Sequence, residues 1–222
     1  MLYQVSLPSN FVKLYFAVFI LVTAVSSFSR TLKADTCTYE TWDWDTIQKK
    51  AINLKKINKP KAELTQEEKG PTEGCSVCQE DQVDIQIERI PTFKVCKIIK
   101  DKILDAVNKT LKSNFSILSA VGYRVGKTKG PLNSNGHRTQ FSNHSYGMAV
   151  DFNSEKNGLY DLCPSFNSSC KLIRGGPYYP GGLGGITPES AIYKNMIAQG
   201  FKWGGEINGK QKDFMHFSLS GM

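Results

Sequence analysis

The hydrophobic and polar positions divide the chain of 222 residues into three parts. Residues 14–25 are almost all apolar, residues 35–90 are mainly polar, and from Pro91 onwards apolar residues recur with the spacing of regular secondary structure. This pattern predicts a leader at 1–34, an extension at 35–90 and one compact domain at 91–222.

The compact domain carries the periodicities of both helices and strands. Apolar residues recur every four positions from Val95 through Ile99, Ile103 and Val107 to Leu111, which is typical of an amphipathic helix laid on a core. The other expected elements are a strand at 116–125, a loop at 126–141, a strand at 148–152, a glycine-rich loop or lid at 163–186, a helix from Thr187 to about Ala198, and strands at 201–205 and 216–220. Together they predict an α+β fold with a small, mainly antiparallel sheet and flanking helices.

The extension at 35–90 has too few apolar residues for a core of its own. Trp42 and Trp44 are interpreted as packing anchors, and the lysine-rich stretch that follows them predicts a helix. We expect this segment to wrap around the compact domain and to be held there by its cysteines.

The leader has the order of a secretory signal peptide. Lys13 precedes the apolar run, and small and polar residues follow it up to Ala34. The run is short for a membrane span, and an uncleaved anchor that attaches the protein to a membrane is the alternative. Both interpretations predict that the rest of the chain is exported.

Export determines how the cysteines are interpreted, because disulfides persist in oxidising compartments. The candidates for disulfide bonds are Cys37, Cys75, Cys78, Cys96, Cys163 and Cys170. The sequence alone fixes no pairing. Cys163 and Cys170 bracket a short polar loop and are favoured as a pair, and the other four would then tie the extension to the start of the compact domain. A redox role for Cys75 and Cys78 and a four-cysteine zinc site are both disfavoured.

Charge is distributed unevenly along the exported part. Residues 35–90 hold 8 basic and 12 acidic side chains, whereas residues 91–222 hold 17 basic and 8 acidic ones. A basic domain favours anionic partners, which for an exported protein are cell-wall polymers or lipid surfaces rather than nucleic acid. The alternative is a solvated basic surface without a binding role.

Two of the three histidines lie beside short apolar runs, each with an aspartate at a fixed offset. His144 precedes Asp151 by seven residues, and Asp213 precedes His216 by three. One such residue alone is ordinarily a hydrogen-bonded polar group. Two imidazoles and a carboxylate from separate strands, however, form a three-ligand zinc site with one open position, the arrangement of catalytic zinc. The third histidine, His137, lies in the predicted loop, where we expect solvent exposure.

These motifs resemble the M15 peptidases, a family of zinc D-alanyl-D-alanine carboxypeptidases and L,D-endopeptidases that includes VanY-type enzymes. The resemblance covers roughly residues 91–222 and does not include the extension. The residues that carry it are Ser142-Asn143-His144 through Asp151, Trp203-Gly204-Gly205 and Asp213-Phe214-Met215-His216-Phe217, which match the family in order and spacing.

The resemblance implies that His144, Asp151 and His216 bind zinc and that Asp213 is the general base. The residues agree with this chemistry. Zinc lowers the pKa of bound water towards neutrality, so a nearby carboxylate can take the proton while hydroxide attacks a peptide carbonyl. Asp213 is close enough to His216 in the chain for one loop to place both at the metal.

The resemblance also implies an upstream arginine that binds substrate and stabilises the oxyanion. We assign this role to Arg124. Arg138 is a rival, and a structural arginine paired with a carboxylate is the alternative for Arg124. Candidates for substrate contact or for hydrogen bonds near the zinc ligands are Ser142, Tyr146 and Trp203, with a local turn as the alternative for the first two.

The expected function is therefore that of an exported zinc metallopeptidase of the bacterial periplasm or cell envelope. Its expected partners are peptidoglycan stem peptides, with D-alanyl-D-alanine carboxypeptidase activity favoured over L,D-endopeptidase activity. The competing class is a non-catalytic binding domain with a Hedgehog-like zinc site. The complete set of three ligands together with Asp213 favours the enzyme.

Overall fold

The computed structural model describes residues 35–221, and the predicted leader at 1–34 lies outside them. No helix in this described part is long and apolar enough to cross a bilayer. The strands are β1 (Thr36–Asp45), β2 (Lys50–Pro60), β3 (Gln82–Ile87), β4 (Ile90–Cys96), β5 (Ala120–Val121), β6 (Val125–Leu132), β7 (Arg138–Phe141), β8 (Ala149–Phe152), β9 (Leu159–Asp161), β10 (Lys171–Arg174), β11 (Lys202–Trp203), β12 (Lys212–Asp213) and β13 (His216–Ser218). The α-helices are α1 (Gln66–Lys69), α2 (Lys100–Leu111) and α3 (Ala191–Ala198).

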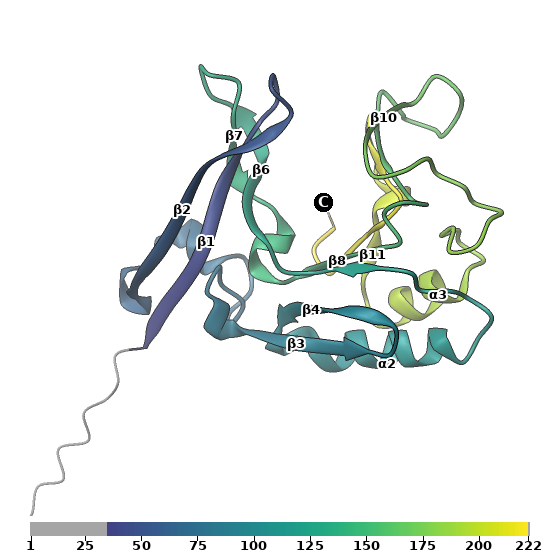
Figure 1. The fold of residues 1–222 in the computed structure, drawn as a ribbon, viewed down its shortest axis with the longest axis horizontal. Coiled ribbons are helices and arrows are strands. Elements are labelled where there is room, and N and C mark those ends of the chain that lie inside the picture. The colour runs from purple at the N-terminus through teal and green to yellow at the C-terminus, as the bar shows by residue number, and fades with distance from the viewer. Residues whose placement is uncertain (1–34, 222) are drawn as a thin grey trace, which may run out of the picture. The chain divides into compact units, whose positions relative to one another are not determined.

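An antiparallel sheet with the strand order β11-β13-β8-β5 forms the centre of the domain. Phe152 on β8 and Phe217 on β13 are fully buried and meet edge to face, with 6.1 Å between their ring centroids. Burying side chains of this size contributes about 2–3 kcal/mol each. Helices α2 and α3 lie on one side of β8, and β6 and β10 lie on the other side (Figure 1). The predicted α+β fold with a mainly antiparallel sheet is thus confirmed.

Helix α2 begins later than predicted, at Lys100. Its buried residues Ile103, Ala106, Val107 and Thr110 follow the helical period, as expected. Val95 belongs instead to β4, where Phe93 and Val95 are buried and Lys94 between them is exposed. This alternation is the period of a strand, so the prediction of a helix from Val95 was wrong at its start.

The lysine-rich stretch of the extension is a strand and not a helix. It forms β2, which pairs with β1 in an antiparallel hairpin over nearly its whole length. The order β2-β1-β6-β7 leaves β2 at the sheet edge, where three of its four lysines are exposed. Lysines on an edge strand discourage pairing with other chains, which accounts for a composition that resembles a solvated helix.

Residues 126–141 are also more regular than the predicted loop. They lie mostly in β6 and β7, an antiparallel hairpin, and β6 runs parallel to β1 from Thr41 to Asp43. Pairing with β1 supplies partners for the backbone N–H and C=O groups of this polar segment. The extension therefore shares one sheet with the compact domain.

Three further boundaries differ from the predictions. The expected strand at 116–125 is reduced to β5, because the Asn153 side chain accepts hydrogen bonds from the backbone of Leu118 and Ser119. The glycine-rich segment at 163–186 is mostly irregular, as expected, but includes β10. Helix α3 begins at Ala191, since Thr187 and Ser190 form a hydrogen-bonded turn before it.

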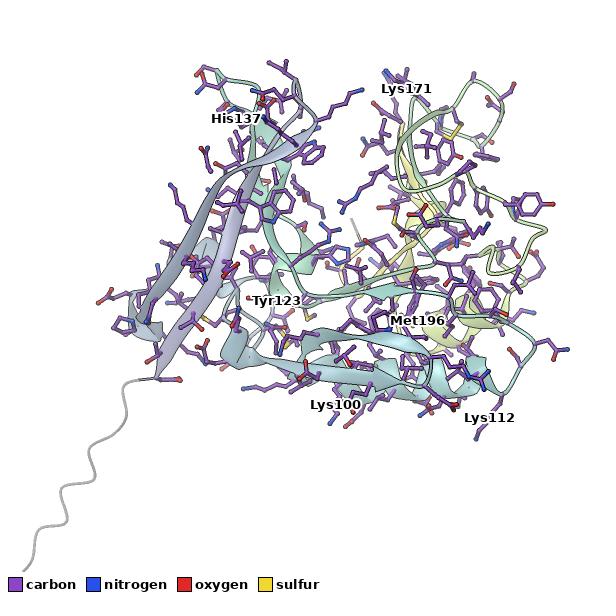
Figure 2. The ribbon with its side chains drawn as sticks, viewed as in Figure 1. Lys100, Lys112, Tyr123, His137, Lys171 and Met196 are labelled. Atoms are coloured by element: carbon purple, nitrogen blue, oxygen red, sulfur yellow. A yellow bond between two sulfur atoms is a disulfide. The ribbon has the colours of Figure 1, made fainter. Side chains whose placement is uncertain are left out.

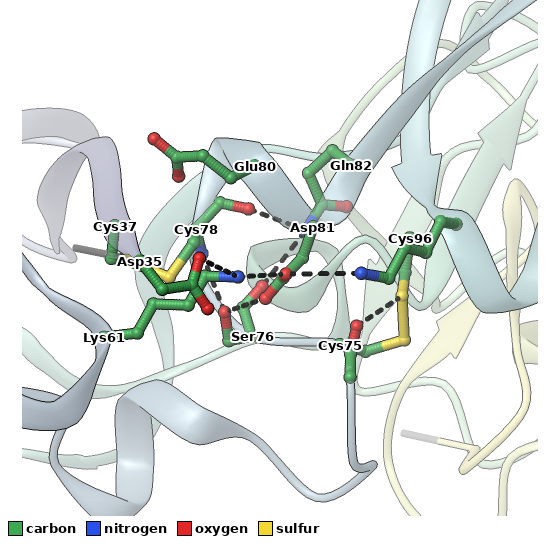
Figure 3. A network of polar contacts seen from close by, with 12 residues as sticks. Asp35, Cys37, Lys61, Cys75, Ser76, Cys78, Glu80, Asp81, Gln82 and Cys96 are labelled. Carbon is green, nitrogen blue, oxygen red and sulfur yellow. Dashed lines mark hydrogen bonds and ion pairs between the residues drawn. A yellow bond between two sulfur atoms is a disulfide. The ribbon is translucent and has the colours of Figure 1, made fainter. Parts of the chain in front are cut away.

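Three disulfides join all six cysteines: Cys37–Cys78, Cys75–Cys96 and Cys163–Cys170. Cys75–Cys96 joins the extension to the compact domain, as expected, whereas Cys37–Cys78 lies within the extension, contrary to the expectation that all four of these cysteines would link the two parts. A buried polar cluster, which we call the Asp81 cluster, lies beside these bonds (Figure 3). Asp81 accepts hydrogen bonds from Lys61 at 2.8 Å and from Ser76 at 2.5 Å. Covalent and polar links thus add to the apolar residues of the extension, among them Val77 and Ile85, that are buried in the common core.

Candidate metal centre

Neighbouring strands of the central sheet carry two of the three predicted ligands. Asp151 on β8 and His216 on β13 are direct partners in the antiparallel register, so their side chains project from the same face. His144 comes from the short 3-10 helix η4 (Asn143–Tyr146) that precedes β8. Gly147 ends this helix with a φ of +65°, and a Cβ there would lie 2.0 Å from the Gln82 side chain. Glycine is required for the chain to turn here.

The three side chains converge on one point and are buried. Asp151 Oδ1 lies 3.0 Å from His144 Nε2 and 3.0 Å from His216 Nδ1, and the two nitrogens are 3.2 Å apart. The residues are only 2–6% exposed. Such a group could hold a metal ion.

The position of the ring proton of His144 indicates that its Nε2 and the carboxylate of Asp151 present lone pairs to each other. Its Nδ1 lies 2.8 Å from the carbonyl oxygen of Gly122, which can only accept a hydrogen bond, so the ring proton is on Nδ1. Burial lowers the pKa of His144 to about 4, although the charge of Asp151 opposes this shift. Neutral His144 therefore directs an unprotonated Nε2 at the Asp151 carboxylate. A cation between these atoms resolves this contact, and two imidazole nitrogens with one carboxylate oxygen are a donor set that suits zinc.

The second oxygen of Asp151 is used separately. Arg124 Nη2 donates to Asp151 Oδ2 at 3.1 Å, and this leaves Oδ1 for the shared point. Burial would raise the pKa of Asp151, but the two histidines hold it well below the usual range, so the carboxylate stays ionised. Arg124 Nε is buried without a hydrogen-bond partner. Arg124 is thus paired with a carboxylate, as the alternative of a structural arginine predicts. It also keeps N–H donors that are not used in this contact.

Asp213 is the last residue of β12, and its backbone packs closely against Gly204. A Cβ at Gly204 would lie 2.2 Å from the Asp213 carbonyl oxygen, so only glycine permits this approach. The residue as a whole is half-buried, but its Oδ1 is fully buried and has no hydrogen-bond partner. Burial raises the pKa of Asp213 to about 7, and the charge of Asp151 adds to this effect. The group is therefore placed to gain and lose a proton near neutral pH.

Three of the predicted contact residues bond elsewhere. The Tyr146 hydroxyl donates to the backbone of Glu67 at 2.9 Å, and Arg138 donates to Gly130 within the β6–β7 hairpin at 2.7 Å. The Trp203 indole donates to the carbonyl oxygen of Phe214 at 2.8 Å and so supports the segment between Asp213 and His216.

Ser142 and His137 also depart from simple expectations. The hydroxyl of Ser142, directly before η4, is buried and has no hydrogen-bond partner. His137 is largely buried rather than exposed, because it lies 3.8 Å from the buried carboxylate of Asp45 at the end of β1. The solvent exposure predicted for His137 was wrong, because the end of β1 pairs with this hairpin, a contact that the local sequence does not indicate.

Two charged residues near Asp213 were missed. Arg174 at the end of β10 and Lys129 on β6 both interact electrostatically with Asp213. Neither lies in a recognisable motif. Only the pairing of β10 with β9, and of β9 with β12, brings Arg174 into the site.

Comparison with known proteins agrees with this geometry. Residues 135–219 match the model of a peptidase family of the M15 type, described as D-alanyl-D-alanine carboxypeptidase. The matched residues include the three converging side chains and Asp213, and they exclude Arg124 and the extension. No solved structure matches the chain. The resemblance to M15 peptidases is confirmed over residues 135–219.

Proposed function

We propose that this protein is an exported zinc metallopeptidase that cleaves peptidoglycan stem peptides, chiefly as a D-alanyl-D-alanine carboxypeptidase. The observation that carries the proposal is the convergence of His144, Asp151 and His216 beside the buried carboxylate of Asp213, within a region that matches the M15 peptidases. The three disulfides support export, because such bonds persist outside the reducing cytosol.

His144, Asp151 and His216 would hold the zinc ion. Bound zinc supplies a Lewis acid that acidifies water and polarises a carbonyl oxygen. Asp213 takes the proton from the attacking water and returns it to the amine of the leaving residue. Its raised pKa, about 7, suits both steps, because proton transfer is most effective when the pKa of the group is near the working pH.

Arg124 has two connected functions in this proposal. Its contact with Asp151 Oδ2 fixes the orientation of that carboxylate, as neighbours of metal ligands do. Its remaining donors stabilise the negative charge that develops on the carbonyl oxygen. The Gly122 carbonyl fixes the ring of His144 in the same way. Gly122 and Arg124 lie within one short segment of the chain.

The decisive experiment uses intact sacculi and a defined pentapeptide muropeptide. The zinc-loaded protein without residues 1–34 is incubated with each substrate, and the products are resolved by mass beside those of Asp213→Ala. Loss of one terminal alanine is the expected result, and internal cuts would identify the L,D-endopeptidase instead. Equal inactivity of the wild type and the variant, both with metal bound, would refute the enzyme and favour a Hedgehog-like binding domain.

A further inference from the structure

Two cations interact electrostatically with Asp213 without being bonded to it. Arg174 lies at the end of β10 and is exposed, and Lys129 lies in the middle of β6 and is half-buried. Within residues 35–221, neither side chain has a hydrogen bond or an ion pair. Asp213 Oδ1 likewise has no partner. The charges are therefore neighbours that leave their hydrogen-bonding groups available to a ligand.

The register of the small sheet β10-β9-β12 places Arg174 on the same face as Asp213. Leu159 on β9 is the direct partner of Arg174 on one side and of Asp213 on the other. Directly opposed residues in a sheet project to the same face, so both side chains project from the face that carries Leu159. An arginine side chain is long enough to extend across one intervening strand.

The chain after Arg174 is also packed against the strand of a metal ligand. Gly175 has a φ of +74°, and a Cβ at this position would lie 3.1 Å from the side chain of Met215, the neighbour of His216. Lys129 lies on β6, the strand that follows Arg124 in the chain. Partial burial lowers the pKa of Arg174, and the charge of Arg124 lowers it further. Burial also lowers the pKa of Lys129, while Asp213 opposes that change.

We infer that Arg174 forms a carboxylate-binding subsite that takes the C-terminal carboxylate of the peptide substrate. This inference rests on the proposed function. The amine that Asp213 protonates and the terminal carboxylate belong to the same leaving residue, with only one carbon between them, or ~2.5 Å from nitrogen to carboxyl carbon. An anion site for that carboxylate must therefore adjoin Asp213, and Arg174 is the exposed cation there.

A guanidinium suits this task better than a general basic surface does. It presents parallel donors that match the two oxygens of a carboxylate, whereas an ammonium acts as a point charge. The alternative is that the two cations merely neutralise Asp213. That role would be expected to produce an ion pair, and the structure has none between Asp213 and either residue in its described part.

The test compares an N-acetylated peptide ending in D-alanyl-D-alanine with the same peptide carrying a C-terminal amide. Initial rates are measured for the zinc-loaded wild type, Arg174→Ala, Arg174→Lys and Lys171→Ala. Lys171 is the matched control, because it is an exposed cation at the other end of β10 (Figure 2). Thermal unfolding and zinc content check that each variant is folded and loaded.

The wild type and Lys171→Ala should prefer the free carboxylate. In Arg174→Ala this preference should fall roughly tenfold or more, through KM with little change in kcat, because a binding contact common to the ground and transition states is lost. Arg174→Lys should retain part of it. Unchanged preference in an active Arg174→Ala enzyme would overturn the inference and leave the proposed function standing.

A binding measurement decides the matter if no peptide is cleaved. Affinities for the two peptides are compared in zinc-loaded Asp213→Ala protein, with and without Arg174→Ala. Tighter binding of the carboxylate form that disappears with Arg174 supports the subsite even where the proposed function fails. Equal affinities of the two peptides for the protein that retains Arg174 would refute it.

Discussion

The candidate metal centre and the Asp81 cluster are both buried and polar, but they differ in whether their polar groups are hydrogen-bonded. In the cluster, Asp81 is bonded to Lys61 and Ser76, and Lys97 lies 3.8 Å away (Figure 3). Around the metal centre, several buried atoms have no hydrogen-bond partner in the described chain. These atoms are Arg124 Nε, Ser142 Oγ, Asp213 Oδ1 and His216 Nε2.

This difference distinguishes a cluster that stabilises the fold from a site that is proposed to carry out a reaction. Buried polar groups in folded proteins are ordinarily paired, because an unpaired one costs about 1–3 kcal/mol. The cluster follows this rule and fastens the extension to the domain. One exception there is Gln82 Oε1, for which we have no physical account. The candidate metal centre departs from the rule repeatedly, which agrees with the proposal that its partners are a metal ion, water and substrate.

The largest effect should come from a change in the metal centre that leaves the fold intact. Asp213→Asn removes the proton acceptor while preserving the shape of the side chain. We expect turnover of a D-alanyl-D-alanine peptide to fall by roughly 10²- to 10⁴-fold, with normal zinc content. The midpoint of thermal unfolding should not fall. Activity within a few fold of the wild type would exclude Asp213 as the base.

The next largest effect should come from the covalent link of the extension. Replacing both Cys75 and Cys96 by alanine should lower the free energy of unfolding by roughly 2–5 kcal/mol, because the unfolded chain gains freedom. Denaturant unfolding measures this change. The matched control replaces Cys163 and Cys170, which close a much shorter loop and should cost less. A larger loss in the control would show that the extension is not held as described.

A change in the Asp81 cluster should cause a smaller loss of stability and should leave kcat unchanged. Asp81→Ala leaves the ammonium of Lys61 without its closest carboxylate, and we expect a cost of roughly 1.5–3 kcal/mol. Asp84→Ala breaks an exposed pair with Lys94 and should cost less than about 1 kcal/mol. At a temperature where both variants are folded, their kcat should equal that of the wild type. A selective loss of kcat in Asp81→Ala would contradict the division between support and chemistry.

The last effect concerns pH and the metal-free protein. The pKa of Asp213 is about 7 when folded, above its value of about 4 in an unfolded chain. The folded state therefore binds more protons, and this contribution to stability is lost as pH rises from about 4 to about 7. The melting temperature of Asp213→Asn relative to the wild type should rise over this range. A constant difference would show that the carboxyl pKa is not raised.

The site was more predictable than the framework around it. His144, Asp151 and His216 flank short apolar runs, and their partnership follows from two adjacent strands in one register. Arg174 could not be found in this way, because its position depends on pairings across β9 between segments distant in the chain. Its local sequence is a polar, glycine-rich stretch that suggests only a loop.

The extension was mispredicted for a related reason. Most lysines of β2 are exposed because β2 is an edge strand, and exposed lysines are equally common on a helix. What distinguishes the two is the partner strand β1 and the parallel pairing of β1 with β6. These are non-local contacts that no window of sequence contains. The disulfide pairing depends on the same arrangement.

Zinc content tests the central claim most directly. The wild type, His144→Ala and the surface control Lys171→Ala are purified in parallel, dialysed against trace zinc and analysed for metal by mass spectrometry. The account predicts about one zinc per chain in the wild type and the control, and a loss of most of it in His144→Ala, because three protein ligands are the usual set of such a centre. Full zinc retention by His144→Ala would contradict the assignment of the metal to His144, Asp151 and His216.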